Sequence, residues 1–190
     1  MNIDKDLAIE TDDEVYPPSD DSYLLIESLE MRPKEKVLEI GCGSGIVSIH
    51  CAKNGALVTC GDVNSKAVTL TKKNAALNNI RLDVRETDVY SRISEVFDTI
   101  IFNLPYLPVN DEGLLAVSWS GGDDGMGPLP ELLDYAPYHL EDGGRVVIVV
   151  SSLMDGDRMN AFLSAYNVSI LGELPLFFEK LRVLEIKLRR

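Results

Sequence analysis

The segment Val37-Leu38-Glu39-Ile40-Gly41-Cys42-Gly43-Ser44-Gly45 joins a short apolar run to a Gly-x-Gly-x-Gly turn, and a helical pattern begins directly after it. Glycine in such a turn lets a ligand approach the backbone closely, at the edge of a sheet where its strands end. We therefore expect a nucleoside-binding loop. Glycines also make plain tight turns, and nicotinamide enzymes use a related spacing, so the loop alone does not name the ligand.

The rest of the chain continues this alternation of short apolar runs with helical stretches. That order predicts an α/β fold of three layers, in which helices cover both faces of a mostly parallel, seven-stranded sheet. The last two runs are separated by too few residues for a crossover, so we expect them to pair antiparallel. The expected strands are 37–40, 56–61, 82–86, 97–102, 145–151, 168–172 and 181–188, and the expected helices are about 20–31, 46–54, 64–79, 129–140 and 156–166.

Length and composition are those of a soluble globular protein. The chain has 190 residues, of which 45% are hydrophobic and 26% charged, and this length suits a single domain, 1–190. Residues 1–14 carry six acidic side chains and no long apolar run, so we expect a mobile leader and no signal peptide. Because no transmembrane segment is apparent either, we expect a cytoplasmic protein without membrane contact.

Cysteine content and charge narrow the classes of ligand. The three cysteines, Cys42, Cys51 and Cys60, match no zinc or Cys-x-x-Cys spacing, so we expect buried thiols and no metal site. The formal net charge of −13 disfavours a broad phosphate-binding surface, and hence nucleic acid as a partner. A protein substrate is easier to reconcile with this charge.

Polar side chains lie at or just after the ends of the first three strands, beside the glycines. A carboxylate can hold a ligand ammonium group at the first strand, ribose hydroxyls at the second and an adenine amino group at the third. Helix capping or a solvated turn would explain each of the later positions taken alone. In chain order the candidate residues are Glu39, the glycines Gly41, Gly43 and Gly45, then Asp62, Asn64 and Asp88.

Together these residues resemble the successive cofactor motifs of class I S-adenosylmethionine-dependent methyltransferases. The resemblance extends over most of the chain, because the Rossmann-like sheet of that class also ends in an antiparallel hairpin. It implies that S-adenosylmethionine is the cofactor and that the residues named above bind it.

The fourth predicted strand runs out into Asn103-Leu104-Pro105-Tyr106, at the sheet edge that carries the glycine loop. A nitrogen in an amide or an exocyclic amine is planar and weakly basic, so its methylation needs acceptors that orient its hydrogens. The Asn103 side-chain oxygen and a backbone carbonyl near Leu104 can provide them. Pro105 would fix the turn, and Tyr106 would offer a flat face for stacking. The alternative is an ordinary proline-containing loop that leaves a buried strand.

This segment resembles the (Asn/Asp)-Pro-Pro-Tyr motif of enzymes that methylate glutamine side chains or the amino groups of bases, with Leu104 in place of the usual proline. The resemblance implies that Asn103, Pro105 and Tyr106 are catalytic residues. It also implies that Asn103, Leu104 and Tyr106 contact the methyl acceptor, and that Asn103 contacts the cofactor as well.

Two further segments favour the glutamine branch of these enzymes. Val15-Tyr16-Pro17-Pro18-Ser19-Asp20-Asp21-Ser22 resembles the opening motif of the archaeal and eukaryotic HemK-like methyltransferases, and Trp119-Ser120-Gly121-Gly122 resembles their Trp-x-Gly-Gly loop. Members of that group methylate the glutamine of the Gly-Gly-Gln motif in class I translation release factors. The resemblance implies this substrate, and a small zinc-binding activator protein on an apolar edge near the third strand. Tyr16 would contact the cofactor, and Trp119 would line the acceptor pocket or belong to the core.

Our leading hypothesis is N5-methylation of a release-factor glutamine, and two other functions stay open. The same Asn-x-Pro-Tyr chemistry also permits methylation of the N6-adenine or N2-guanine amino group in RNA or DNA. That methylation also requires base extrusion and a phosphate-binding surface, which the acidic charge disfavours. A catalytically silent cofactor-binding subunit is the third possibility, and the intact Asn103, Pro105 and Tyr106 argue against it.

Overall fold

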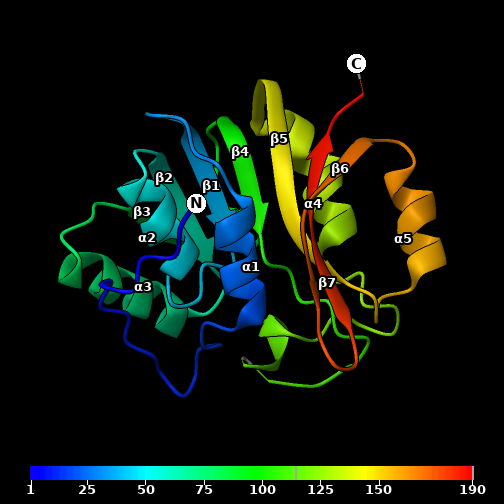
Figure 1. Ribbon diagram of the computed structural model, residues 1–190, viewed down its shortest axis with the longest axis horizontal. Helices are drawn as coiled ribbons and strands as arrows, with labels where there is room; N and C mark the ends of the chain where they lie inside the picture. The colour runs from blue at the N-terminus through cyan, green and yellow to red at the C-terminus, as the bar shows by residue number, and fades with distance from the viewer. Residues whose placement is uncertain (114, 190) are drawn as a thin grey trace.

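The computed structural model describes residues 1–113 and 115–189, which form a seven-stranded sheet with helices on both faces (Figure 1). The strands lie in the order β3-β2-β1-β4-β5-β7-β6. The predicted fold class is confirmed. The strands are β1 (Lys36–Ile40), β2 (Leu57–Asp62), β3 (Asp83–Glu86), β4 (Phe97–Phe102), β5 (Leu140–Ser151), β6 (Asn167–Pro175) and β7 (Lys180–Lys187).

Strands β1 to β5 pair in parallel, and β7 pairs antiparallel with both β5 and β6. Five helices accompany the sheet within the described residues, and each begins where the sequence provides a start signal. A glycine at φ 80° precedes α2, and Asn64 caps α3 by accepting a hydrogen bond from the backbone N–H of Lys66. The helices are α1 (Asp20–Ser28), α2 (Ile46–Lys53), α3 (Ser65–Leu77), α4 (Leu129–Tyr135) and α5 (Gly156–Leu163).

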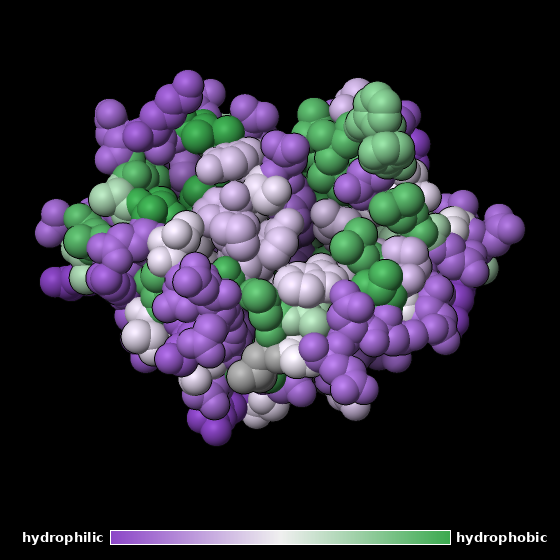
Figure 2. Space-filling view, turned by 90° about the horizontal axis from the view of Figure 1, so that it is seen from below, coloured by the Kyte–Doolittle hydropathy of each residue, from purple (hydrophilic) through white to green (hydrophobic). Residues whose placement is uncertain are grey.

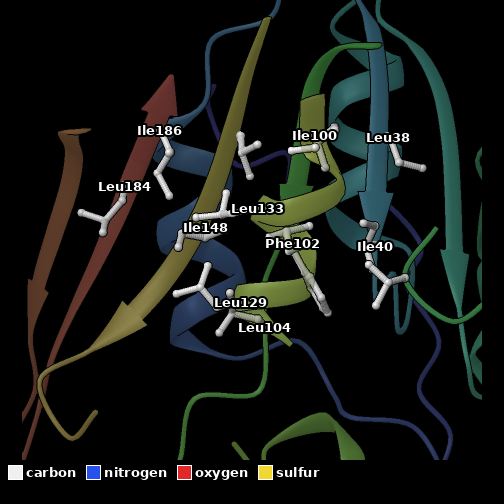
Figure 3. Close-up of a cluster of buried hydrophobic side chains, with 14 of the residues drawn as sticks. Leu38, Ile40, Ile100, Phe102, Leu104, Leu129, Leu133, Ile148, Leu184 and Ile186 are labelled. Atoms are coloured by element: carbon white, nitrogen blue, oxygen red, sulfur yellow. The ribbon is translucent and has the colours of Figure 1, made fainter. Parts of the chain in front are cut away.

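Alternate residues of the central strands enter two separate cores, one on each face of the sheet. In β5, Val147 and Val149 pack toward α1 and α2, whereas Val146, Ile148 and Val150 pack toward α4. Figure 3 shows the second of these cores, where α4 covers the ends of β1, β4 and β5. Burial on both faces explains why the strands appear in the sequence as unbroken apolar runs.

The expected helix 129–140 is wrong at its carboxyl end. The α-helix stops at Tyr135, a 3₁₀ turn follows at Ala136–Tyr138, and β5 already begins at Leu140, five residues before the expected strand. Pro137 has no backbone N–H and cannot continue an α-helix. The early part of β5 was missed because its residues 141–144 form an irregularity in the pairing with β4, between the partners of Phe97 and Thr99.

Residues 1–14, the expected mobile leader, lie along α2 and α3. Asparagine side chains within and directly after α3 bond the leader backbone as a neighbouring strand would. Asn78 accepts from the N–H and donates to the carbonyl of Ala8, and Asn74 does the same for Glu10. Asn74 also donates to the carbonyl of Ser44 in the glycine loop, at 2.8 Å. Leader and glycine loop are therefore joined through one buried amide.

We expect Asn74→Ala to lower the free energy of unfolding by about 2–3 kcal/mol, because it removes three hydrogen bonds and leaves the buried Ser44 carbonyl without its partner. Asn78→Ala removes the equivalent contacts at an exposed part of the leader and one bond to the carbonyl of Asn74, and it should cost about 1 kcal/mol or less because water can replace the exposed bonds. Urea denaturation of both variants measures the difference. Equal losses would show that Asn74 does not connect the leader to the glycine loop.

Candidate active site

A cavity of about 670 Å³ lies at the edge of the sheet where the parallel strands end. These strands point downward in Figure 1, so Figure 2, which is seen from below, looks onto this edge. Residues 15–22 before and within α1, the glycine loop after β1, and segments following β2, β3 and β4 all contribute to the cavity lining. Its volume is in the range of small-molecule sites.

The glycine loop requires glycine where its backbone crowds other elements. Gly45 has φ +80°, and a Cβ there would lie 2.8 Å from a Thr71 side-chain atom of α3. Gly41 has φ +68°, and a Cβ there would lie 2.8 Å from the Phe102 ring at the end of β4. The loop is therefore packed tightly between α3 and β4, and its backbone faces the cavity.

Glu39 lies at the end of β1, is 3% exposed and lines the cavity. Its carboxylate accepts a hydrogen bond from the Ser48 hydroxyl of α2. Burial raises the pKa of the Glu39 carboxyl to about 8, because a charge in a low-dielectric site is poorly solvated. A cationic ligand group beside this buried carboxyl would favour its ionised form and lower its pKa.

Asp62 and Asn64 already make hydrogen bonds within the protein. Asp62 accepts from the backbone N–H of Gly43 with one oxygen and of Asn64 with the other, both at 2.9 Å, and burial raises the pKa of its carboxyl. The Asn64 side chain caps α3 and donates to the carbonyl of Glu14. Asp62 keeps further acceptor capacity toward the cavity, whereas both ends of the Asn64 amide are used.

Asp88 is exposed and lines the cavity beyond β3. Its neighbours Thr87 and Val89 also line the cavity, and Val89 has an unusual φ of 42° for a β-branched residue. Neither of these two neighbours was predicted from the sequence. No sequence pattern marks Val89, because its conformation is set by the turn after β3 and not by its residue type.

Asn103 follows the last residue of β4 and lines the same cavity as the glycine loop. Among the described residues, its Oδ1 is the one buried side-chain oxygen or nitrogen without a hydrogen-bond partner. Such an orphaned acceptor is costly unless a ligand satisfies it. The Leu104 side chain is buried in the core beside Leu129 (Figure 3), so only its backbone is left to contact an acceptor.

Tyr106 lies opposite Tyr16 across a buried carboxylate. Both hydroxyls donate to Oδ2 of Asp21 at 3.4 Å, and Asp21 itself is 4% exposed. Burial first, and then the charge of Asp21, raises the pKa of both tyrosines, so both stay protonated donors. Asp21 thereby links the segment before α1 to the loop after β4. Asp21 stands in the motif before α1, but no role for it was predicted from the sequence, since its two partners lie five and 85 residues away.

Trp119 lines the cavity and donates through its indole N–H to Asp111 at 2.8 Å. The loop that follows is tied to the segment after β4, because the N–H of Gly121 donates to the carbonyl of Leu107 and the N–H of Leu107 donates to the carbonyl of Trp119. Of the two roles expected for Trp119, lining of the acceptor pocket is thus compatible with its position. Pro105 also lines the cavity, between Leu104 and Tyr106.

The arrangement can be compared with known proteins. The sequence pattern of the methyltransferase small domain family matches residues 18–170, from just before α1 into β6. The chain belongs to this family. It is a methyltransferase.

Two relatives identify the branch of methyltransferases. A protein of Methanocaldococcus jannaschii named "Putative protein N5-glutamine methyltransferase MJ0928" is 39% identical over 178 residues, which are 90% of each chain. The human protein "Methyltransferase HEMK2" is 31% identical, with 72% of this chain and 71% of that protein covered. This methyltransferase is therefore of the HemK type.

Further matches extend the comparison. A ribosomal RNA small subunit methyltransferase C of Haemophilus influenzae is 31% identical, over 69% of this chain and 37% of that protein. Among solved structures, the E. cuniculi Mtq2-Trm112 complex, described as responsible for methylation of the eRF1 translation termination factor, matches with a TM-score of 0.68 and 18% identity. The match covers 93% of this chain and 99% of that chain. At that identity the likeness shows the fold.

S-adenosylmethionine matches the polar and apolar groups that line the cavity. Its amino-acid part carries an ammonium group, and the buried Glu39 can take it up. Asp62, which has free acceptor capacity, would hold the ribose hydroxyls, and Val63 and Val89 would form apolar walls for the adenine. The cofactor residues predicted from sequence all line this one cavity except Gly45, whose role is in the turn into α2.

The pKa of Glu39 predicts how stability depends on pH. The folded value of about 8 exceeds the ordinary 4.5, so the folded protein binds this proton more tightly than the unfolded chain does. The stability that the protonated Glu39 carboxyl contributes is fully present below about pH 4.5 and is lost as pH rises toward about 8. Glu39→Gln should not show this loss of stability, because glutamine does not titrate. All other titrating groups are the same in both proteins.

Urea denaturation of wild type and Glu39→Gln at about pH 5 and about pH 8 tests this dependence. Between the two pH values, the free energy of unfolding should fall more for the wild type than for the variant. An identical pH dependence would mean that the Glu39 carboxyl is ionised at neutral pH.

Proposed function

We propose that this methyltransferase uses S-adenosylmethionine to methylate the side-chain amide nitrogen of a glutamine, in the Gly-Gly-Gln motif of a class I translation release factor. The observation that carries the proposal is the buried, unpaired Oδ1 of Asn103, in the cavity that also holds the glycine loop. The name of the Methanocaldococcus jannaschii relative and the described activity of the E. cuniculi complex support the choice of acceptor.

The cofactor site is proposed at the end of β1 and β2. Glu39 would hold the ammonium group, Asp62 the ribose hydroxyls and Asp88 the adenine amino group, with Tyr16 covering the cavity from the segment before α1. When bound, S-adenosylmethionine supplies a methyl group on a positively charged sulfur. Asn64 acts through its cap of α3 and its bond to Glu14, which place the leader beside the cavity.

The acceptor site is proposed at the end of β4. Oδ1 of Asn103 accepts a hydrogen bond from the glutamine NH₂ group, and this bond orients the planar amide. Tyr106 and Trp119 wall the amide, and Pro105 fixes the loop that carries them. Alignment of the nitrogen with the methyl group supplies much of the rate. The nitrogen forms its bond to the methyl carbon as the carbon–sulfur bond breaks, and one amide proton leaves to water.

An activator subunit is proposed as well. The E. cuniculi structure is a complex of two proteins, and in this chain β3 is an edge strand of the sheet. Leu82 and Val84 at that edge are only partly buried. A small zinc-binding protein paired with β3 would cover them.

Methylation of an RNA base is the second candidate, and the Haemophilus influenzae relative favours it. An exocyclic amine would meet the same Asn103 oxygen. Against it stands the formal net charge of −13, because RNA binding relies on cationic side chains that displace counterions. The acidic chain therefore suits a protein acceptor better.

A labelled methyl-transfer assay distinguishes the acceptors. Wild-type protein is incubated with S-adenosylmethionine and with a class I release factor, its Gly-Gly-Gln glutamine→alanine variant, or structured RNA, each with and without a candidate activator. We expect label in the intact release factor alone, and more of it with the activator. Label in RNA alone, or label that persists on the alanine variant, would overturn the proposed acceptor, and no label in any arm would favour a silent cofactor-binding subunit.

Variants of the two subsites should fail in different ways. Asn103→Ala should lower turnover by about 100-fold or more, while calorimetry still detects cofactor binding. Asp62→Ala should weaken cofactor binding first, by about tenfold or more, because it also releases the N–H of Gly43.

Asn110→Ala is the matched control, since Asn110 is an exposed asparagine in the loop after β4 whose amide contacts Asp123. It should leave both turnover and cofactor affinity near wild type. Unchanged turnover of Asn103→Ala would remove Asn103 from the mechanism.

A further inference from the structure

The turn between β6 and β7 exposes two large aromatic side chains. Phe177 is 92% exposed and Phe178 is 85% exposed, and their rings meet edge-on with centroids 4.6 Å apart. Leu153, just after β5, is 42% exposed. We call these three residues the hairpin patch. Scattered exposed apolar residues are common, but a cluster of them at one edge marks an interaction site.

Hydrogen bonds hold the hairpin patch in place. The N–H of Leu176 donates to the carbonyl of Glu179 at 2.8 Å, which closes the turn around the two phenylalanines. Ser152, next to Leu153, exchanges two hydrogen bonds with Lys180 at the start of β7. The rings therefore stand on a defined turn, which lowers the entropic cost of binding a partner through them.

The hairpin patch lies at the same edge of the sheet as the cavity. Ser151, the last residue of β5, pairs with Leu181 of β7, and its hydroxyl donates to Glu179 at 2.5 Å. Burial and the charge of Asp21 are the main reasons for the raised pKa of Tyr16 and Tyr106, and the charge of Glu179 adds to both. The turn that carries the phenylalanines is thus a neighbour of the cavity mouth.

The surroundings of the cavity indicate which kind of partner covers this edge. In Figure 2, apolar side chains gather on the side where the β6–β7 turn lies, a further apolar group lies on the opposite side, and hydrophilic side chains border both. Exposed carboxylates, including Asp111 and Glu112 beside Trp119, repel the phosphates of a nucleic acid. An apolar patch beside an acidic region suits a protein with an apolar surface of its own.

We propose that the hairpin patch is a docking surface for the protein that carries the methyl-accepting glutamine. The proposal rests on the proposed function. The glutamine must reach Asn103 inside the cavity, so the body of its protein covers the edge from which the patch projects. Phe177 and Phe178 then contact an apolar surface of that protein outside the short segment that contains the glutamine. Binding of the intact protein depends on this contact, whereas the reaction at Asn103 does not.

The test compares an intact acceptor with a short one. The variant Phe177→Ser/Phe178→Ser is assayed with the intact release factor and with a short synthetic peptide that contains its Gly-Gly-Gln segment, in the presence of the activator if the wild type needs it. Because buried aromatic residues dominate interface affinity, KM for the intact factor should rise about tenfold or more. The kcat with both acceptors and KM for the peptide should equal the wild-type values.

Val168→Ser/Ile170→Ser is the matched control. It removes two exposed apolar side chains, 40% and 58% exposed, from β6 of the same hairpin, at roughly 20 Å along the chain from the turn. All four kinetic constants of this variant should stay at wild-type values.

Each outcome has a distinct meaning. If the wild type methylates the factor and the phenylalanine variant keeps its KM, the docking surface is wrong and the proposed function stands. A raised KM or lowered kcat with the peptide as well as with the intact factor would show that the patch serves the active site or the activator. This result would also overturn the docking role. If the wild type transfers no label to the glutamine, the proposed function fails and the docking role falls with it.

Discussion

The parallel pairing of β1 with β4 is the constraint on which the site depends. Their register places Ile40 opposite Phe102, so the chain leaves both strands at the same height, with Gly41 on one and Asn103 on the other. The approach is close enough that Gly41 has no room for a Cβ beside the Phe102 ring. Packing of both strands in the two cores fixes this register, because a shift of one residue would exchange the side chains that fill one core with those that fill the other.

Desolvation gives the cavity its chemical character. The same burial that raises the pKa values of Glu39 and Asp62 also covers Oδ1 of Asn103, which has no hydrogen-bond partner in the protein. Unsatisfied acceptors in such an environment favour ligands that bring hydrogen-bond donors or positive charge. An ammonium group on one side and an amide NH₂ on the other meet that requirement, and an anionic ligand would not.

The sequence predicts most of the fold and the main residues of the cavity for a simple reason. Strand ends, glycine turns and buried apolar runs are local patterns, and a parallel sheet brings successive strand ends to one edge. Features that depend on distant contacts were missed. The role of Asp21 needs both Tyr16 and Tyr106, the turn at Val89 depends on packing after β3, and β5 begins early because its irregular segment pairs with β4. The leader contacts need asparagines that lie more than 60 residues away.

The asparagine contacts of α3 have a consequence for the evolution of the leader. Within the leader, Asn74 and Asn78 bond only main-chain groups, those of Glu10 and Ala8, and every residue except proline presents those groups identically. Substitutions in the leader can therefore accumulate while its path over α3 is kept. The selective constraint falls on the asparagines, and a drifting leader sequence would conceal a preserved attachment from any comparison of sequences alone.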